Sequence, residues 1–237
     1  MAIHYNSKIS TDGLVLCLDA GNPKSYPGSG TTWTDLSSNG NTGTLVNGVG
    51  YNSGNLGSLS FDGVNDYVGC GSGIDSTISF GQGKSFTLEV FFETNDYTTL
   101  QSIIARRNID GSGSTDYMIF YQGSNLIFGT GISSDIGAWR NLGTAFTYNN
   151  QIMHFCGVVN STGDETGTKI TYKNGVQIDS VSYTKKASPT ANQTFIGKVN
   201  GDSLYFNGKI YSTKIYNRAL TASEIQQNYN ALKSRFQ

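Results

Sequence analysis

The sequence of 237 residues is poor in charge, because only 14% of its residues are Asp, Glu, Lys or Arg, against about 25% in an average soluble domain. Its 16 basic and 17 acidic residues leave a net charge of −1. Proteins that bind nucleic acid neutralise phosphates with many Lys and Arg side chains. We therefore expect no nucleic-acid partner.

Cysteine and long apolar runs are also scarce. Cys17, Cys70 and Cys156 lie in separate strand-like segments without the CxxC spacing of zinc or redox sites, so we expect buried free thiols. No apolar run approaches the roughly 20 residues that span a bilayer, which argues against membrane insertion. Residues 1–7 lack the basic start and apolar stretch of a secretory signal, which predicts synthesis in the cytosol.

Glycine, in contrast, is abundant, with 30 residues of 237. Short runs with a period of two alternate with Gly, Asn, Asp and Ser, a pattern typical of antiparallel strands joined by tight turns. About a dozen such strands in a chain of this length predict one large β-sandwich. The predicted strands cover residues 14–19, 56–61, 67–70, 85–93, 101–106, 117–121, 125–128, 152–159, 168–172, 176–181, 194–196 and 209–216.

Two of these segments differ in pattern. Residues 85–93 have apolar side chains on one face, and they carry Glu89 and Glu93 on the other, which predicts a strand with both carboxylates in solvent. Residues 152–159 are apolar at both sets of alternating positions. They are therefore predicted to form a central strand that is covered on both sides.

A turn and a helix are signalled locally. Asn174-Gly175 between two strand-like runs predicts a type I′ hairpin, because both central residues of that turn need a positive φ. Thr221 and Glu224 form a capping box, and apolar residues follow at helical spacing, which predicts a single helix over about 221–235. We expect an N-terminal arm over 1–12 and one domain over 13–237.

Three stretches resemble the laminin-G-like, concanavalin A-like lectin/glucanase family. They are FDGVNDYV at 61–68, SFTLEVFF at 85–92 and the segment 206–221 with FNGKI and YNRALT. Their order along the chain is that of the family, and the resemblance covers about 13–232. It implies an all-β, two-sheet antiparallel jelly-roll sandwich. Phe91 and Met153 stand where the family usually has Trp.

Catalysis has little support in the sequence. Related glucanases use a strand-borne Glu-x-Asp-x-x-Glu string, which is missing here. Glu89 and Glu93 would have Cβ atoms about 13 Å apart on one strand face, beyond the roughly 5–9.5 Å between glycosidase carboxyl groups. His154 in the central strand fits a sheet-face histidine better than a base. We expect no enzymatic activity.

Calcium is the cofactor that the resemblance implies, because many family members hold one ion near the sandwich rim. Ca²⁺ prefers carboxylate and carbonyl oxygens from loops, and the candidate ligands are Asp19, Asp62 and Asp66. Asp19 ends the first strand, and the other two flank a Gly-Val-Asn turn. The alternative is that all three cap turns through their side chains.

Glycan binding would need aromatic platforms beside hydrogen-bonding loops. Trp33, Tyr97, Trp139 and Tyr205 lie in loop-like sequence and are the candidates. The alternative for a loop Trp is a lid over the core or an anchor in a protein interface.

The resemblance and a composition rich in Gly, Asn and Ser together imply a non-catalytic bacteriophage virion protein. It would be either a capsid decoration or a tail or fibre accessory. Synthesis without a signal fits this location, because virions assemble inside the cell. Its expected partners are other virion proteins or further copies of itself. The alternative is a carbohydrate-binding module for host-surface polysaccharides, and a glycoside hydrolase ranks last.

Overall fold

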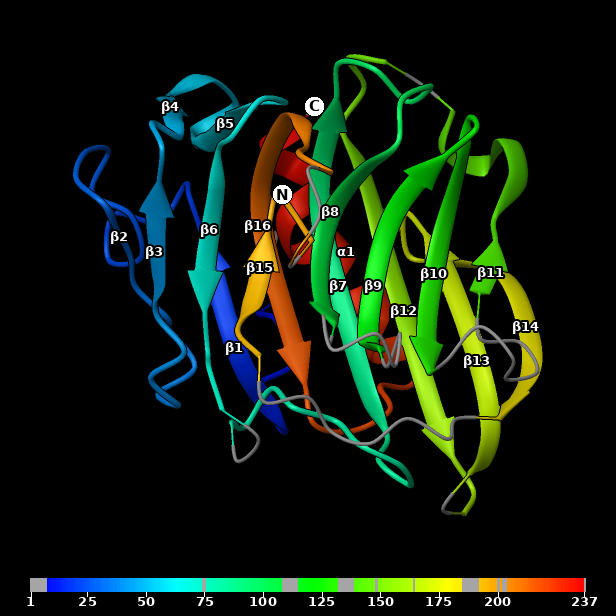
Figure 1. Ribbon diagram of the computed structural model, residues 1–237. Helices are drawn as coiled ribbons and strands as arrows, with labels where there is room; N and C mark the ends of the chain where they lie inside the picture. The colour runs from blue at the N-terminus through cyan, green and yellow to red at the C-terminus, as the bar shows by residue number, and fades with distance from the viewer. Residues whose placement is uncertain are drawn as a thin grey trace, which may run out of the picture.

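The computed structural model describes residues 8–73, 76–107, 115–131, 139–147, 149–163, 165–184, 192–199, 201 and 204–236. Within them the chain forms two eight-stranded antiparallel sheets that face each other and one α-helix (Figure 1). The predicted fold class is thereby confirmed. The first seven residues of the predicted arm lie outside this set. None of the helices in the described part is both long and apolar enough to cross a membrane.

Sheet A has the strand order β14-β13-β12-β7-β16-β5-β4, and β1 follows β5 along the same edge of β16. The interior strand β12 pairs with β7 on one edge and with β13 on the other. Its two faces are both covered, as predicted, because Phe155 lies in the main core and Cys156 lies beneath the helix. The strands are β1 (Leu14–Asp19), β4 (Gly50–Asn52), β5 (Ser58–Asp62), β7 (Phe86–Thr94), β12 (Met153–Ser161), β13 (Thr166–Lys173), β14 (Val176–Thr184) and β16 (Asn207–Tyr216).

Sheet B has the order β11-β10-β9-β8-β15-β6-β3-β2. Its longest strands are the neighbours β8, β9 and β10, and its other strands have two to four residues. The strands are β2 (Thr32–Trp33), β3 (Gly43–Val46), β6 (Tyr67–Cys70), β8 (Gln101–Arg107), β9 (Thr115–Gln122), β10 (Asn125–Gly131), β11 (Trp139–Asn141) and β15 (Thr194–Ile196). Three short 3-10 helices are η1 (Gly54–Leu56), η2 (Gly143–Phe146) and η3 (Ser234–Phe236).

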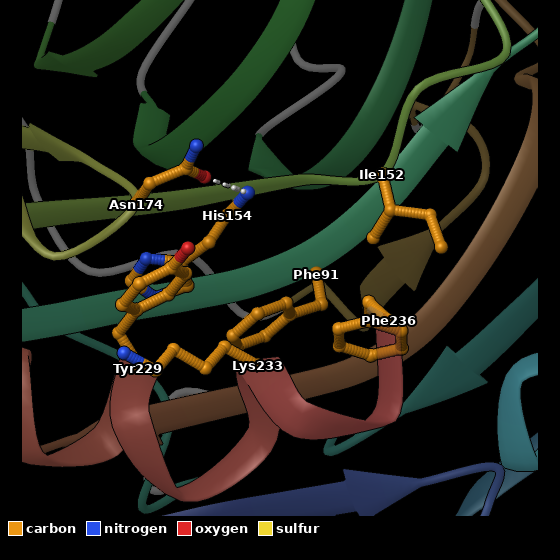
Figure 2. Close-up of a pocket in the computed structure, with 7 residues that line it drawn as sticks. All are labelled: Phe91, Ile152, His154, Asn174, Tyr229, Lys233 and Phe236. Atoms are coloured by element: carbon orange, nitrogen blue, oxygen red, sulfur yellow. Dashed lines mark hydrogen bonds between the residues drawn. The ribbon is translucent and has the colours of Figure 1, made fainter.

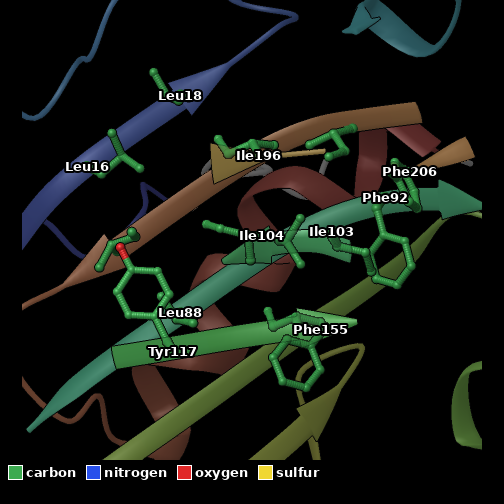
Figure 3. Packing of buried hydrophobic residues seen from close by; sticks show 14 of the residues in the cluster. Leu16, Leu18, Leu88, Phe92, Ile103, Ile104, Tyr117, Phe155, Ile196 and Phe206 are labelled. Carbon is green, nitrogen blue, oxygen red and sulfur yellow. The ribbon is translucent and has the colours of Figure 1, made fainter. Parts of the chain in front are cut away.

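The main core fills the space between the two sheets (Figure 3). Phe128 on β10 and Phe155 on β12 meet edge to face across it, with ring centroids 5.6 Å apart. Each fully buried side chain of this size stabilises the fold by roughly 1.5–3 kcal/mol. All three cysteines are buried free thiols, as predicted. Burial raises the pKa of the Cys17 thiol to about 11, which keeps it protonated and unreactive.

The helix α1 (Ala222–Lys233) packs on the side of sheet A that faces away from sheet B (Figure 1). The predicted capping box is present, with Thr221 accepting from the backbone N–H of Glu224 and the Glu224 side chain accepting from that of Thr221. Ile225 is buried among apolar side chains of sheet A. Asn228, one helical turn away on the same side, is buried as well.

The predicted Asn174-Gly175 hairpin joins β13 to β14, and both residues have positive φ. Sequence reasoning missed four strands, β2, β3, β4 and β11. Each has only two to four residues, which is too short for a period of two to be seen. All four lie at or next to a sheet edge.

Candidate functional site

The outer face of sheet B is not covered by any described helix, and we call it the open face. Along β9 the side chains of Met118 and Phe120 point to this face, whereas Tyr117 points into the core. The open face therefore carries an apolar cluster of its own. Its members are Ala105, Met118, Phe120, Ile127 and Val199, with Trp139 and Leu204 packed against them.

A shallow depression of about 290 Å³ lies in this apolar cluster. Met118, Phe120 and Ile127 are nearly buried and form its floor. Trp139 is partly exposed, so its ring adds an accessible aromatic surface. The remaining lining residues are Leu100, Arg107, Gln122 and Leu204. An apolar floor with a few polar groups beside it is the usual character of a ligand site.

Trp139 is held in place by the strand next to it. It lies directly opposite Gly129 in the β10–β11 pair, and a Cβ atom on Gly129 would come within 2.0 Å of the indole ring. The absence of a side chain there lets the ring lie against the backbone of β10. Phe120 supports the indole from below in an edge-to-face contact, with ring centroids 5.7 Å apart. The platform is therefore built into the sheet.

Trp139 begins a row of residues that crosses the open face from strand to strand. The register places Gly129, Met118, Ala105 and Phe195 in line with it on β10, β9, β8 and β15. Four strand spacings separate Phe195 from Trp139, which is about 19 Å. The open face thus has aromatic rings at two separate places.

The four aromatic glycan-binding candidates lie in different environments. Trp33 is fully buried in the main core, so its ring cannot serve as a surface platform, contrary to expectation. Tyr97 packs partly against the core in the segment after β7. Tyr205 and Trp139 are both partly exposed. Tyr205 lies near Lys198, whose ammonium group contacts Tyr67 and Phe195. The structure therefore brings two of the four candidates to the open face.

The outer face of sheet A, which α1 covers, has the opposite character, and we call it the covered face. Glu89 is 1% exposed there, and its carboxylate lies 3.3 Å from Lys214 Nζ and 3.2 Å from His154 Nε2. Asn228 of the helix donates to the same carboxylate at 2.8 Å. The prediction that Glu89 and Glu93 face solvent is wrong, because α1 and η3 cover this face.

These contacts set the ionisation of the covered face. Burial alone would raise the pKa of Glu89, but the charge of Lys214 and the contacts with His154 and Asn228 outweigh it and lower that pKa to about 2. Burial lowers the pKa of His154 and favours the neutral imidazole. Glu89 is therefore ionised, and its carboxylate binds the helix through Asn228.

A second cavity, of about 90 Å³, lies between the covered face and the end of α1 (Figure 2). Phe91 on β7 stacks parallel to Tyr229 of the helix, with ring centroids 6.2 Å apart. The backbone N–H of His154 donates to Asn174 Oδ1 at 3.1 Å. This volume holds about three water molecules, so the cavity is too small for a sugar ring. The open face is the better candidate for glycan recognition.

The three aspartates predicted as calcium ligands do not form one group, because Asp19 lies apart from the other two. Asp19 accepts from Arg235 at 2.8 Å. Asp19 and Asp62 lie opposite β16 residues five positions apart, which separates them by about 16 Å. Asp62 caps its turn by accepting from two backbone N–H groups, as the alternative predicts.

Asp66 is the aspartate that fits a cation best. It accepts from the backbone N–H of Asp62 through Oδ2, while its Oδ1 is buried and accepts no hydrogen bond from any described residue. Burial and the nearby charge of Asp62 raise the pKa of Asp66. Asp62 and Asp66 could thus offer oxygens to an ion, although no group of three or more metal-ligating side chains occurs in the described part of the chain.

Residues 62–226, more than half of the chain, match the model of the concanavalin A-like lectin/glucanases superfamily. The chain belongs to this superfamily. No curated protein sequence matches it significantly.

Solved structures show the same fold at low identity. The binding domain of Paraclostridial Mosquitocidal Protein 1 is 19% identical with a TM-score of 0.70, and the match covers 93% of this chain and 52% of that one. Domain 4 of an extracellular arabinanase from Geobacillus stearothermophilus, solved with arabinotriose, is 16% identical with a TM-score of 0.61, covering 91% and 98%. A Trypanosoma rangeli sialidase is 15% identical with a TM-score of 0.67, covering 94% and 33%. The chain thus spans about half of the first of these proteins and a third of the sialidase.

Sequence reasoning missed most of the residues that form the open face. Met118, Phe120 and Ile127 were expected only as strand residues, because a period of two does not say which face is left uncovered. The signal that could have indicated it is the apolar character of both faces of residues 117–121. Lys198 gave no signal, because Tyr67, the ring nearest to its ammonium group, lies about 130 positions earlier in the chain.

Proposed function

We propose that this chain is a non-catalytic carbohydrate-recognition domain that binds glycans on the open face. The observation that carries the proposal is the Trp139 ring, held against Gly129 beside an apolar floor. Sugar rings present apolar C–H faces that pack on aromatic rings, and they present hydroxyl groups to polar neighbours. The arabinanase domain with arabinotriose shares this fold, which is consistent with such a role.

The positions of the carboxylates support a role without catalysis. Glu89 and Glu93 lie on the covered face, where Glu93 contacts Lys209 and Tyr211 at 2.8 and 2.9 Å. In the described strands of sheet B the single carboxylate is Asp116, which is buried against Arg106. Glycosidases generally need two carboxyl groups across one sugar bond. We infer that the open face binds glycans without cleaving them.

An array of bacterial polysaccharides tests this function. We expect saturable binding by the wild-type protein and a loss of most of the signal for Trp139→Ala, because the platform is removed. Tyr51→Ala is the matched control, since Tyr51 is an exposed aromatic residue on β4 of sheet A. A flat array with folded wild-type protein would contradict the proposal, and so would equal loss of binding in both variants.

A bacteriophage virion is the location that the composition, rich in Gly, Asn and Ser, favours. A glycan-binding domain there would serve adsorption to the host surface. Mass spectrometry of purified virions, with copy number measured against the major capsid protein, tests this location. Stoichiometric copies are expected for a capsid decoration and a few copies for a tail or fibre accessory. Absence of the chain from virions would contradict the location and leave glycan binding standing.

A further inference from the structure

Lys198, just after β15, lies among three aromatic rings on the open face. Its Nζ is 4.3 Å from the ring centroid of Tyr67, 4.8 Å from that of Phe195 and 5.9 Å from that of Tyr205. Tyr67 and Phe195 also meet edge to face at 5.7 Å. We call these four residues the Lys198 cluster. The rings attract the ammonium group to their faces and thereby limit its positions.

The ammonium group of Lys198 makes no ion pair with any residue that the structure describes. This differs from the lysines of the covered face, since Lys214 pairs with Glu89 and Lys209 pairs with Glu93. Partial burial lowers the pKa of Lys198, because its charged form loses water and no described residue supplies a counter-charge. An anion that binds beside it would supply that counter-charge in a partly desolvated place, where Coulomb attraction is stronger than in bulk water.

The Lys198 cluster and the Trp139 platform are separated by a length of sheet that suits a chain of sugars. Phe195, a member of the cluster, is four strand spacings from Trp139, or about 19 Å. That distance exceeds the size of any single sugar ring. A ligand that reaches both places is therefore an oligosaccharide or a polysaccharide.

We propose that the Lys198 cluster is a subsite for the negatively charged group of an acidic polysaccharide whose other sugars stack on Trp139. The charged group is a carboxylate, as in uronic acids, or an equivalent anionic substituent. This inference rests on the proposed glycan-binding function and adds the chemical class of the ligand. Aromatic rings, unlike a paired carboxylate, do not occupy the N–H donors of Lys198 with hydrogen bonds.

Paired ligands test the charge preference. Wild-type protein is titrated with acidic bacterial polysaccharides and with the same polymers after chemical reduction of their carboxyl groups to alcohols. We expect the acidic form to bind roughly ten times more tightly, as one charge-assisted hydrogen bond would provide, and we expect added salt to weaken this preference. Lys198→Gln should bind both forms equally, and Lys198→Arg should keep the preference.

Lys24→Gln is the matched control, because it removes the same charge at an exposed position in the segment between β1 and β2. It should behave as wild type. Equal binding of acidic and reduced polymers by the wild type would overturn the inference, and so would a preference that survives in Lys198→Gln. If binding then still depends on Trp139, the proposed function stands and only the charge preference falls. Failure to bind any polysaccharide would overturn both.

Discussion

The two outer faces of the sandwich are both β-sheet surfaces, yet they differ in which side chains are buried and which remain at the surface. On the covered face, Glu89, Lys214 and His154 are almost completely buried and hold the helix through Asn228. On the open face, the floor is apolar and Trp139 remains partly exposed. The covered face thus buries an ion pair beneath the helix, whereas the open face leaves apolar area at the surface.

We therefore expect the covered face to determine stability and the open face to determine glycan recognition. Breaking contacts on the covered face should destabilise the fold and leave the glycan site intact, because the two faces lie on opposite sides of the core. An apolar patch that no described helix covers commonly marks a binding surface. The predictions below are ordered from the largest expected effect to the smallest.

The largest effect is expected for Glu89→Ala. The substitution leaves Lys214, whose side chain is 2% exposed, buried without its counter-charge. Removal of one partner from a buried ion pair costs about 3–5 kcal/mol, which denaturation by urea would measure. Glu93→Ala should cost clearly less, because the side chain of its partner Lys209 is 30% exposed and can reach water. Equal losses in the two variants would contradict this account of the covered face.

Acid should destabilise the protein in two steps. The pKa values of Glu89 and His154 are both lower in the folded state than in the unfolded chain, so the unfolded chain binds more protons as the pH falls. Stability is therefore full above about pH 6.5, decreases first as His154 titrates in the unfolded state, and then falls between about pH 4.5 and 2 through Glu89. The Glu89 step corresponds to roughly 3 kcal/mol.

Thermal unfolding between pH 8 and pH 2.5 measures this dependence. The variant His154→Gln should lose the upper step and keep the lower one. A melting temperature that rises when the pH is lowered from 7 to 5 would have the opposite sign and would contradict the assignment of His154 as neutral in the fold.

Gly129→Ala should affect the open face. The new Cβ would overlap the Trp139 ring, so the indole must move away from β10, at a cost of about 1–3 kcal/mol for overpacking. Glycan binding should weaken together with stability, which the polysaccharide array and thermal unfolding would show. Gly50→Ala on β4 is the control, since its Cβ would meet only Ser60 on β5, at ordinary van der Waals distances. Unchanged glycan binding in Gly129→Ala would show that the position of the Trp139 ring does not matter for glycan recognition.

The smallest effect is expected from calcium. If an ion uses the free oxygen of Asp66, a concentration of ten times its Kd stabilises the fold by about 1.4 kcal/mol, which raises the melting temperature by roughly 3–6 °C. Asp66→Asn should abolish this increase, whereas Asp19→Asn should keep it because Asp19 is paired with Arg235. A melting temperature that is independent of calcium and of chelator would exclude the ion.

Much of the fold is predictable because it rests on local patterns. The alternation in residues 85–93, the Asn174-Gly175 turn and the capping box of Thr221 each report on a few neighbouring residues, and the structure confirms them. The same alternation cannot say what lies above a face. Glu89 was therefore expected in solvent, although a helix more than 130 positions later in the chain covers it.

The site is harder to predict because its parts are distant in sequence. Trp33 and Trp139 both lie in loop-like sequence, yet one is a core residue and the other a surface platform. The difference depends on which strand each ring faces, and β11 is too short to be recognised as a strand. The Lys198 cluster likewise joins Tyr67 to residues about 130 positions later.

Tryptophan fluorescence tests the central claim most directly, because the chain has only two tryptophans and one of them is buried. A polysaccharide selected on the array is titrated into wild-type protein and into Trp139→Phe, whose remaining tryptophan is Trp33. The account predicts a saturable change of emission in the wild type and no change in the variant. Tight binding to both proteins without any change in wild-type emission would show that glycans bind elsewhere.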